Sequence, residues 1–412
     1  MYDMNRNHHL FSMASLINGV SFSMILPLLA PLMRQLKLSE LQAGAMVSAG
    51  ALFMAIAAIY LSKHPLKYTI YQLLMIGFVG MSLTWALFSG VLMYGMTAHI
   101  SVLSLFILLV IARATTGVFM AMPQIALQTY IMQHFQEEKS RSQSMAKFGA
   151  LNSLGIIVGP FLTTLFLVGG LMTPLWIAVF LLIMVSVLIS STYDQERGVE
   201  ATVMHSNHRS DQGECVEQHF SIRPILFWLG LGFYIYVAIV TLNLTAGFYL
   251  QDHFQIDIQQ SAIYFSQCSL IVGISLVMMQ LLIAQYLKWS VYQLLSVGML
   301  MMGLGLTITT WTDHIRIFQV AYIFYGIAVA CLMPAFTTGA AKNAPLHLQA
   351  KVAGWCTATQ ALSFVVGPLI STGLYQWQMS SPYYLLLIGL IILSGLLLIE
   401  KKRRKQLMSY SM

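Results

Sequence analysis

Residues 103–130 read LSLFILLVIARATTGVFMAMPQIALQTY and indicate the fold class of the chain. This stretch is apolar for longer than the roughly 20 residues that a helix needs to cross a bilayer. A single charge, Arg113, lies near its middle. Because an arginine at that depth costs about 3 kcal/mol or more on insertion scales, such a residue faces a bundle interior or a water-filled cavity. The stretch therefore predicts a membrane helix inside a larger helical bundle.

The composition of the whole chain is also that of a membrane protein. Of its 412 residues, 58% are hydrophobic and only 8% are charged, which is far from the composition of soluble domains. The net charge of +7 does not indicate nucleic-acid binding, because the basic residues lie in short segments between apolar runs. The cysteines form no C-x-x-C pair, and we interpret them as packing residues or a loop thiol: Cys215, Cys268, Cys331 and Cys356.

Apolar runs long enough to span a bilayer recur along the chain. Twelve spans are predicted, at residues 10–33, 41–61, 69–95, 100–131, 148–169, 172–191, 224–250, 260–285, 290–311, 317–340, 352–376 and 382–399. The fifth and sixth spans are separate helices only if Gly169, Gly170 and Pro174 mark a tight turn. We therefore expect an all-α membrane protein with twelve transmembrane helices.

The basic residues indicate the orientation of these spans. Of the 21 Lys and Arg residues, only Arg34, Lys37 and Arg316 fall in loops on one side, and Arg113 falls within a span. All the others fall on the opposite side. Because Lys and Arg concentrate in cytoplasmic loops, we expect both termini in the cytoplasm of a cell with a bacterial type of inner membrane.

One long polar segment, residues 192–223, divides the chain. Its composition is that of a flexible linker, so we predict one six-helix bundle at 1–191 and another, with a basic tail, at 224–412. The linker contains potential metal ligands whose spacing matches no standard zinc pattern, and we interpret them as incidental: His205, His208, Cys215 and His219. We expect neither a metal nor a cofactor.

The two predicted bundles repeat short sequences. IYQLL at 70–74 recurs as VYQLL at 291–295, at the start of the third helix of each half. VGPFL at 158–162 recurs as VGPLI at 366–370, in the fifth helix. Two parallel six-helix repeats, related by an axis along the membrane normal, predict a central cavity between them near the membrane midplane.

Three motifs resemble those of the major facilitator superfamily, and the resemblance extends over essentially the whole chain. RATTG at 113–117 resembles the R-x-x-x-G motif of the fourth helix in that family. GIIVGP at 155–160 resembles the G-x-x-x-G-P core of the fifth-helix motif of antiporters. PLLAP at 27–31, followed by LSELQAG at 38–44, is similar to the first-helix exit of drug:proton antiporters. The resemblance implies a secondary transporter of the exporting branch that works by alternating access.

The chain also departs from the family's patterns. The loop after the second helix usually reads G-x-x-x-D-R-x-G-R-R, whereas residues 61–68 read LSKHPLKY and lack the aspartate and the glycine. Thr163 and Thr164 stand where a pair of glycines is usual, and the first helix has no membrane carboxylate. These departures leave the superfamily resemblance in place and weaken a multidrug assignment.

Arg113 has two interpretations. Its guanidinium offers five donors and stays charged, which suits clamping a carboxylate or phosphate or tuning a nearby protonatable group. Alternatively, it ties backbone carbonyls of the first helix together. Polar residues of the first, seventh and tenth helices, which line the pathway in relatives, complete the candidate cavity together with Gln360 of the eleventh helix. The alternative role of these residues is helix-to-helix hydrogen bonding: Asn18, Tyr236, Asn243, Tyr325 and Gln360. Tyr236 and Asn243 are seven residues apart and share a helix face.

Glycine and proline pairs predict hinges or close helix contacts in both halves. The residues concerned are Gly155, Gly159, Pro160, Gly367 and Pro368.

Proton coupling needs a titratable side chain, yet every acid and histidine is expected in a loop or at a helix end. Asp252 and Glu40, at the outer ends of the seventh and second helices, are the candidates, with ordinary interfacial charges as the alternative.

These observations predict a monomeric exporter of a small organic molecule, with protons as the coupling ion. A lone buried arginine without a buried acid favours an anionic or zwitterionic substrate, such as a carboxylate siderophore or an acidic metabolite. The alternatives are efflux of lipophilic drugs, proton-coupled uptake of an organic acid or sugar, and a membrane sensor without transport. An enzyme is not expected, because no acid–base pair or nucleophile–base set lies at membrane depth.

Overall fold

The structure is a computed structural model that describes residues 2–63, 68–97, 100–134, 151, 154–155, 158–192, 223–287, 289–343 and 349–410. Within these residues the secondary structure is helical, without a strand. The elements are α1 (Tyr2–Ser23), α2 (Leu26–Gln35), α3 (Glu40–Lys63), α4 (Ile70–Thr97), α5 (Val102–His134), η1 (Leu167–Gly169), α7 (Thr173–Thr192), α8 (Arg223–Phe254), α9 (Ile258–Gln285), α10 (Val291–Trp311), α11 (Ile315–Lys342), α12 (Gln349–Trp377) and α13 (Ser381–Tyr410).

The helices account for the predicted spans. Nine stretches of the described residues are long and apolar enough to cross a membrane, and α1 and α2 together form the first of them. The shorter apolar helices Val158–Gly169 and Ser381–Leu397 supply the fifth and twelfth spans, and α12 supplies the eleventh. The predicted all-α architecture of twelve transmembrane helices is confirmed.

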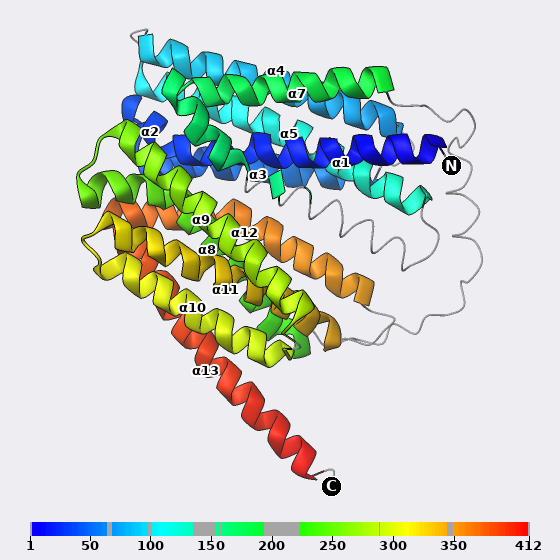
Figure 1. Cartoon of the computed structure of the whole chain (residues 1–412), viewed down its shortest axis with the longest axis vertical. Helices are drawn as coiled ribbons and strands as arrows, with labels where there is room; N and C mark the ends of the chain where they lie inside the picture. The colour runs from blue at the N-terminus through cyan, green and yellow to red at the C-terminus, as the bar shows by residue number, and fades with distance from the viewer. Residues whose placement is uncertain are drawn as a thin grey trace.

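The two halves of the sequence lie in different parts of the molecule. Figure 1 shows the helices from α1 to α7 above those from α8 to α13. Across this division α3 packs against α12, and α2 packs against α8 and α9. The predicted linker falls almost entirely between the end of α7 at Thr192 and the start of α8 at Arg223, so its histidines and Cys215 lie outside the described residues.

The repeated YQLL sequences begin corresponding helices, as predicted. Thr69 and Gln72 at the start of α4 bond reciprocally, each side chain accepting from the other residue's backbone N–H at 3.0 and 3.2 Å. Ser290 and Gln293 form the same capping box at the start of α10, at 2.8 and 3.4 Å. These bonds satisfy donors that the first turn of a helix leaves free. The repeat therefore encodes the start of each half's third helix.

The first span is interrupted, whereas the sequence predicted one run over 10–33. α1 ends at Ser23 and α2 begins at Leu26. Pro27 causes the break, because proline lacks an N–H and its ring clashes with the carbonyl four residues earlier, that of Ser23. The Thr163 hydroxyl donates to the Met24 carbonyl at 2.9 Å. A broken helix in a bilayer needs new hydrogen-bond partners for its free backbone groups. Thr163, at a position where the family usually has glycine, provides such a partner.

Glycine allows α3 and α5 to approach closely beside Arg113. A Cβ atom added to Gly117 of α5 would lie 2.1 Å from the Gly50 carbonyl oxygen of α3. A Cβ added to Gly50 would lie 3.3 Å from the Arg113 carbonyl oxygen. The obstacles are backbone atoms, so a larger residue at position 117 forces the two helices apart.

We expect Gly117→Ala to destabilise the fold by about 1–3 kcal/mol, the usual effect of overpacking. The midpoint of thermal unfolding in detergent measures this change. Gly90→Ala in α4 is the matched control, because its Cβ would meet nothing within 4 Å. Equal midpoints for the two variants would contradict the tight α3–α5 contact.

Candidate functional site

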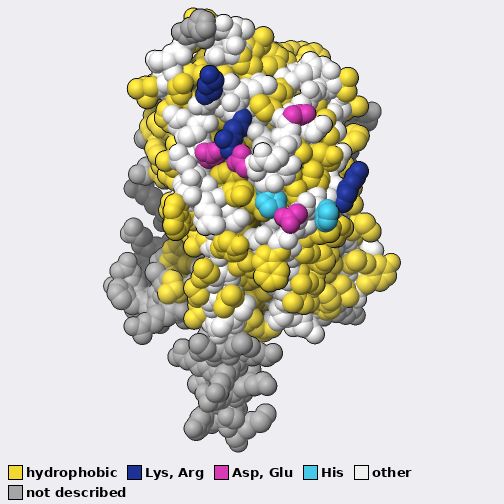
Figure 2. Space-filling model, turned by 90° about the vertical axis from the view of Figure 1, so that its left-hand side faces the viewer, with side chains coloured by type: hydrophobic (Ala, Val, Ile, Leu, Met, Phe, Trp, Pro, Cys, Tyr) yellow, Lys and Arg dark blue, Asp and Glu magenta, His cyan; other side chains and the backbone are white. Residues whose placement is uncertain are grey.

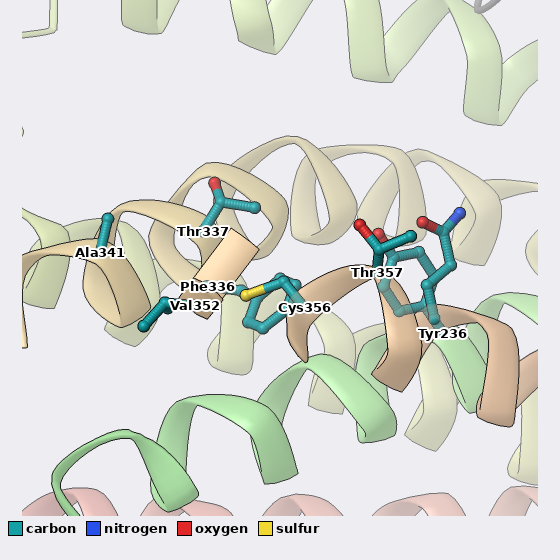
Figure 3. Close-up of a pocket in the computed structure, with 8 residues that line it drawn as sticks. Tyr236, Phe336, Thr337, Ala341, Val352, Cys356 and Thr357 are labelled. Carbon is teal, nitrogen blue, oxygen red and sulfur yellow. The ribbon is translucent and has the colours of Figure 1, made fainter. Parts of the chain in front are cut away.

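A pocket of about 310 Å³ lies in the C-terminal half between α8, α11 and α12 (Figure 3). Its lining residues are Tyr236, Phe336, Thr337, Ala341, Val352, Cys356, Thr357 and Gln360. Ala341 and Val352 lie near the end of α11 and the start of α12, the ends that the basic residues predict to face the cytoplasm. The pocket is therefore displaced toward the predicted cytoplasmic side.

The pocket combines an aromatic wall with a few polar groups. The Tyr236 ring meets Phe336 edge to face, with 6.3 Å between ring centroids. Thr357 and Gln360 offer a hydroxyl and an amide, and none of the described lining residues is Lys, Arg, Asp or Glu. Small-molecule sites have this character, with apolar walls and a small number of hydrogen-bonding groups that orient the ligand.

Two of the predicted cavity residues, Tyr236 and Gln360, line this pocket, and the others lie elsewhere. The Asn243 side chain donates to the Ile239 carbonyl of its own helix at 2.7 Å. Tyr325 is fully buried, and its hydroxyl lies 2.6 Å from the Thr309 Oγ1 atom of α10. Asn18 of α1 is half-buried, and its Oδ1 atom has no partner among the described residues.

The sequence did not single out the remaining lining residues. Phe336 and Cys356 read as ordinary packing residues in apolar helices, and Thr337 and Thr357 as isolated hydroxyls. One signal was available, because Cys356 and Gln360 are four residues apart and therefore lie on the same face of α12. Which face of α12 meets α8 and α11 depends on the tertiary packing.

Arg113 lies in the N-terminal half and is not part of the pocket. Its side chain lies among α3, α4 and α5 with 7% of the residue exposed. The guanidinium carbon is 5.2 Å from the centroid of the Trp85 ring and 5.8 Å from that of Phe88, both on α4. Cation–π contacts of this kind contribute about 0.5–2 kcal/mol and offer no lone pair to the N–H groups.

The guanidinium has unpaired donors. Within the described residues, its Nε and Nη1 atoms have no hydrogen-bond partner, and no carboxylate forms an ion pair with it. On the adjacent α4, the buried Trp85 Nε1 and Ser89 Oγ atoms also have no partner there. Unpaired buried donors are costly, and a buried cation more so. This region therefore has a positive charge and free donors, and it would gain from an anion.

The glycine–proline repeat has different surroundings in the two halves. A Cβ added to Gly155 would lie 2.1 Å from the Leu16 carbonyl oxygen, and one on Gly159 would lie 2.8 Å from the Val20 carbonyl oxygen. The helix that contains Gly159 and Pro160 therefore presses directly on the α1 backbone. A Cβ added to Gly367, next to Pro368, would make only ordinary contacts of 3.5 Å or more with α8.

Asp252 and Glu40, the candidates for proton coupling, share one partner. The Arg34 Nη2 atom lies 2.6 Å from Glu40 Oε1 and 2.6 Å from Asp252 Oδ2. The Tyr375 hydroxyl donates to the same Asp252 oxygen at 2.7 Å. Sequence reasoning left Arg34 and Tyr375 out, because residues 34 and 252 are 218 positions apart and nothing local pairs them.

The model of the Major Facilitator Superfamily matches residues 11–368 and 278–408, so it extends over most of the sequence. The chain belongs to this superfamily. Its function is therefore membrane transport of a small molecule. No curated protein matches the sequence of this superfamily member.

Solved transporters share the fold. A mutant of the nucleoside transporter NupG is 11% identical with a TM-score of 0.71, and the match covers 95% of this chain and 99% of that one. A bacterial homologue of the human lysosomal transporter Spinster, inward-facing and occupied, is 13% identical with a TM-score of 0.70, covering 98% and 97%. A D-xylose–proton symporter is 12% identical with a TM-score of 0.69, covering 95% and 97%. At these identities the likeness shows the fold alone.

The exposure of the cysteines predicts which thiol of this superfamily member a labelling reagent modifies. Cys356 is half-buried in the pocket lining, whereas Cys268 and Cys331 are fully buried. In the full chain with Cys215→Ser, we expect a maleimide to modify Cys356 and spare the other two, because thiol reactivity follows exposure. Mass spectrometry of the labelled peptides identifies the site. Labelling that persists at the same rate in Cys356→Ser would contradict the predicted accessibility.

Proposed function

We propose that this transporter exports a small anionic or zwitterionic organic molecule, such as a carboxylate siderophore or an acidic metabolite, by proton-coupled alternating access. The observation that carries the proposal is the Arg113 guanidinium, which is buried and has unpaired Nε and Nη1 donors within the described residues. Keeping a charge in this environment costs free energy, so the binding of an anion that compensates the charge is favoured.

A carboxylate suits the guanidinium of Arg113. The Nε and Nη1 groups face different sides of the planar group, so each can donate its own bond to an anion, and charge-assisted bonds are about twice as strong as neutral ones. The Trp85 N–H and the Ser89 hydroxyl on α4 also have no partner within the described residues. A lipophilic cation would meet an uncompensated positive charge there.

The proposed export and proton coupling are supported by the sequence motifs and by the architecture. The G-x-x-x-G-P core at 155–160 resembles the motif of the antiporting branch. A D-xylose–proton symporter shares the fold, so the architecture is compatible with proton coupling. The proposed setting is a bacterial inner membrane, with both termini in the cytoplasm and a monomer as the working unit, and the inside excess of basic residues supports this orientation. Asp252 and Glu40 are the proposed proton-responsive groups.

The pocket supports a second candidate function, efflux of uncharged or lipophilic compounds. Its described lining residues form aromatic and aliphatic walls and carry no formal charge. Such a pocket binds apolar ligands by burying their surface, at about 25 cal/mol per Å². An amphipathic carboxylate would use both features, whereas a drug-like cation or neutral compound would need the pocket alone.

Inverted membrane vesicles energised acid inside test the proposed function. We expect labelled carboxylates to accumulate, and a protonophore to abolish the accumulation, whereas labelled cations and neutral compounds stay outside. Accumulation of lipophilic cations would instead establish the second candidate. Uptake of carboxylates or sugars only by right-side-out vesicles would show import and overturn the proposed direction.

Arg113→Ala tests the role of the charge. We expect carboxylate export to fall about 10- to 100-fold, the effect of losing hydrogen bonds to a charged group. Arg113→Lys should retain part of the activity, because the charge remains while the planar set of several N–H donors is lost. The thermal midpoint in detergent controls for folding. Unchanged export by a folded Arg113→Ala variant would exclude an anionic substrate bound at this residue.

A further inference from the structure

An ion cluster joins the two halves at the end of the molecule that the basic residues predict to face outward. Figure 2 views this end and shows acidic and basic side chains lying together on it. The outer cluster consists of Arg34 from α2, Glu40 from α3, Asp252 from α8 and Tyr375 from α12. Arg34 and Glu40 belong to the N-terminal half, and Asp252 and Tyr375 to the C-terminal half.

Arg34 is the link between the halves. Its Nη2 atom contacts a Glu40 oxygen and an Asp252 oxygen at 2.6 Å each, and its guanidinium carbon lies 5.4 Å from the centroid of the Phe248 ring of α8. Arg34 and Asp252 are each about one-third exposed, while Glu40 is 12% exposed. Partly buried pairs such as these are screened less by salt than fully exposed ones.

About one helical turn further into the molecule than the outer cluster, the two halves are in close contact. A Cβ added to Gly44 of α3 would lie 2.1 Å from Thr372 Oγ1 and 2.7 Å from the Pro368 carbonyl oxygen, both on α12. A Cβ added to Gly247 of α8 would lie 2.7 Å from the Ala30 Cβ atom of α2. Thr372 is fully buried. These contacts close the molecule beneath the outer cluster, whereas the pocket lies toward the opposite end.

Alternating access requires the two halves to part at this end during each cycle. The contacts of Arg34 with Asp252 must then break, because the two residues move apart with their own halves. When they do, Arg34 keeps Glu40 and Asp252 keeps the Tyr375 hydroxyl. Neither charge is left without a partner, so separating the halves avoids most of the penalty for unpairing a partly buried ion.

We propose that Arg34 is a gating residue that closes the outer end by binding Asp252, and that Glu40 holds Arg34 when this end opens. The two carboxylates therefore have opposite effects. Asp252 stabilises the closed outer end, because it binds Arg34 only there. Glu40 favours the open one, because it stays with Arg34 in both arrangements, while its negative charge lies near that of Asp252 only when the end is closed. This inference rests on alternating access and is independent of the substrate and the coupling ion.

Thr372→Cys reports on opening of the outer end. The position is buried while the halves touch, so its reaction with a maleimide measures the population of molecules in which they have separated. Because the labelling rate scales with that minor population, a small shift in the equilibrium gives a proportional change in rate. The background is the full chain with Cys215→Ser and Cys356→Ser, since Cys268 and Cys331 are fully buried. No substrate is added.

We expect Asp252→Asn and Arg34→Gln to raise the labelling rate about threefold or more, within the range that one partly exposed ion pair supports. Glu40→Gln should lower it, because Arg34 then has a charged partner only in the closed arrangement. The double variant Arg34→Gln/Asp252→Asn should label no faster than the quicker single variant, since both remove the same contact. Arg316→Gln is the matched control, an exposed arginine without an ion pair to any described residue.

The opposite signs for the two acids are the decisive result. If Asp252→Asn and Glu40→Gln change the labelling rate in the same direction, or if neither differs from Arg316→Gln, the proposal is wrong. Asp252→Asn and Glu40→Gln nearly keep the native shapes and carry the test if Arg34→Gln does not fold. Ala30→Cys, buried in α2 against Gly247 of α8, replaces the reporter if Thr372→Cys is unstable. A failed transport assay does not affect this result, because labelling needs no substrate.

Discussion

The bilayer requires every backbone N–H and C=O group to find a partner within the protein, and the rest of this structure follows from that constraint. It restricts the spanning segments to helices and makes every interruption conspicuous. At the interruption between α1 and α2, the Thr163 hydroxyl takes over as the partner of the Met24 carbonyl. Reciprocal side-chain caps begin α4 and α10 in the same way. Many polar side chains of this protein therefore form hydrogen bonds with backbone groups. Buried polar side chains that do not are candidates for a role in function.

Arg113 is the clearest of these candidates. Its surroundings on α3, α4 and α5 supply rings and small residues but, within the described residues, no acceptor for Nε and Nη1. The pocket lies in the other half and has the reverse character, because its described lining residues provide hydrogen-bonding groups and aromatic walls but carry no charge. The two halves repeat each other in sequence and helix order, yet the buried arginine lies in one of them and this pocket in the other.

The number and type of the helices, their starts at the repeated YQLL sequences and the burial of Arg113 were all predictable, because they depend on local pattern and on the energetics of charge in a membrane. The cavity residues were predictable only in part. Tyr236 and Gln360 line the pocket, but Tyr325 bonds Thr309 within the helix core. Which face of α11 or α12 meets α8 is set by packing among segments far apart in the chain. The same limit hid Arg34, which reads as an ordinary loop cation until α8 and α12 bring Asp252 and Tyr375 to it.

The two glycine–proline motifs have unequal surroundings in the two halves. Gly155 and Gly159 lie against the α1 backbone with no space for even one carbon atom, so the two helices are packed there backbone to backbone. Gly367 has ordinary clearance from α8, whereas on the other side of α12 the Pro368 carbonyl and the Thr372 side chain press on Gly44 of α3. The same helix carries Cys356 of the pocket and Tyr375 of the outer cluster. A change in how α12 meets α3 at the outer end would therefore pass along one continuous helix to the wall of the pocket.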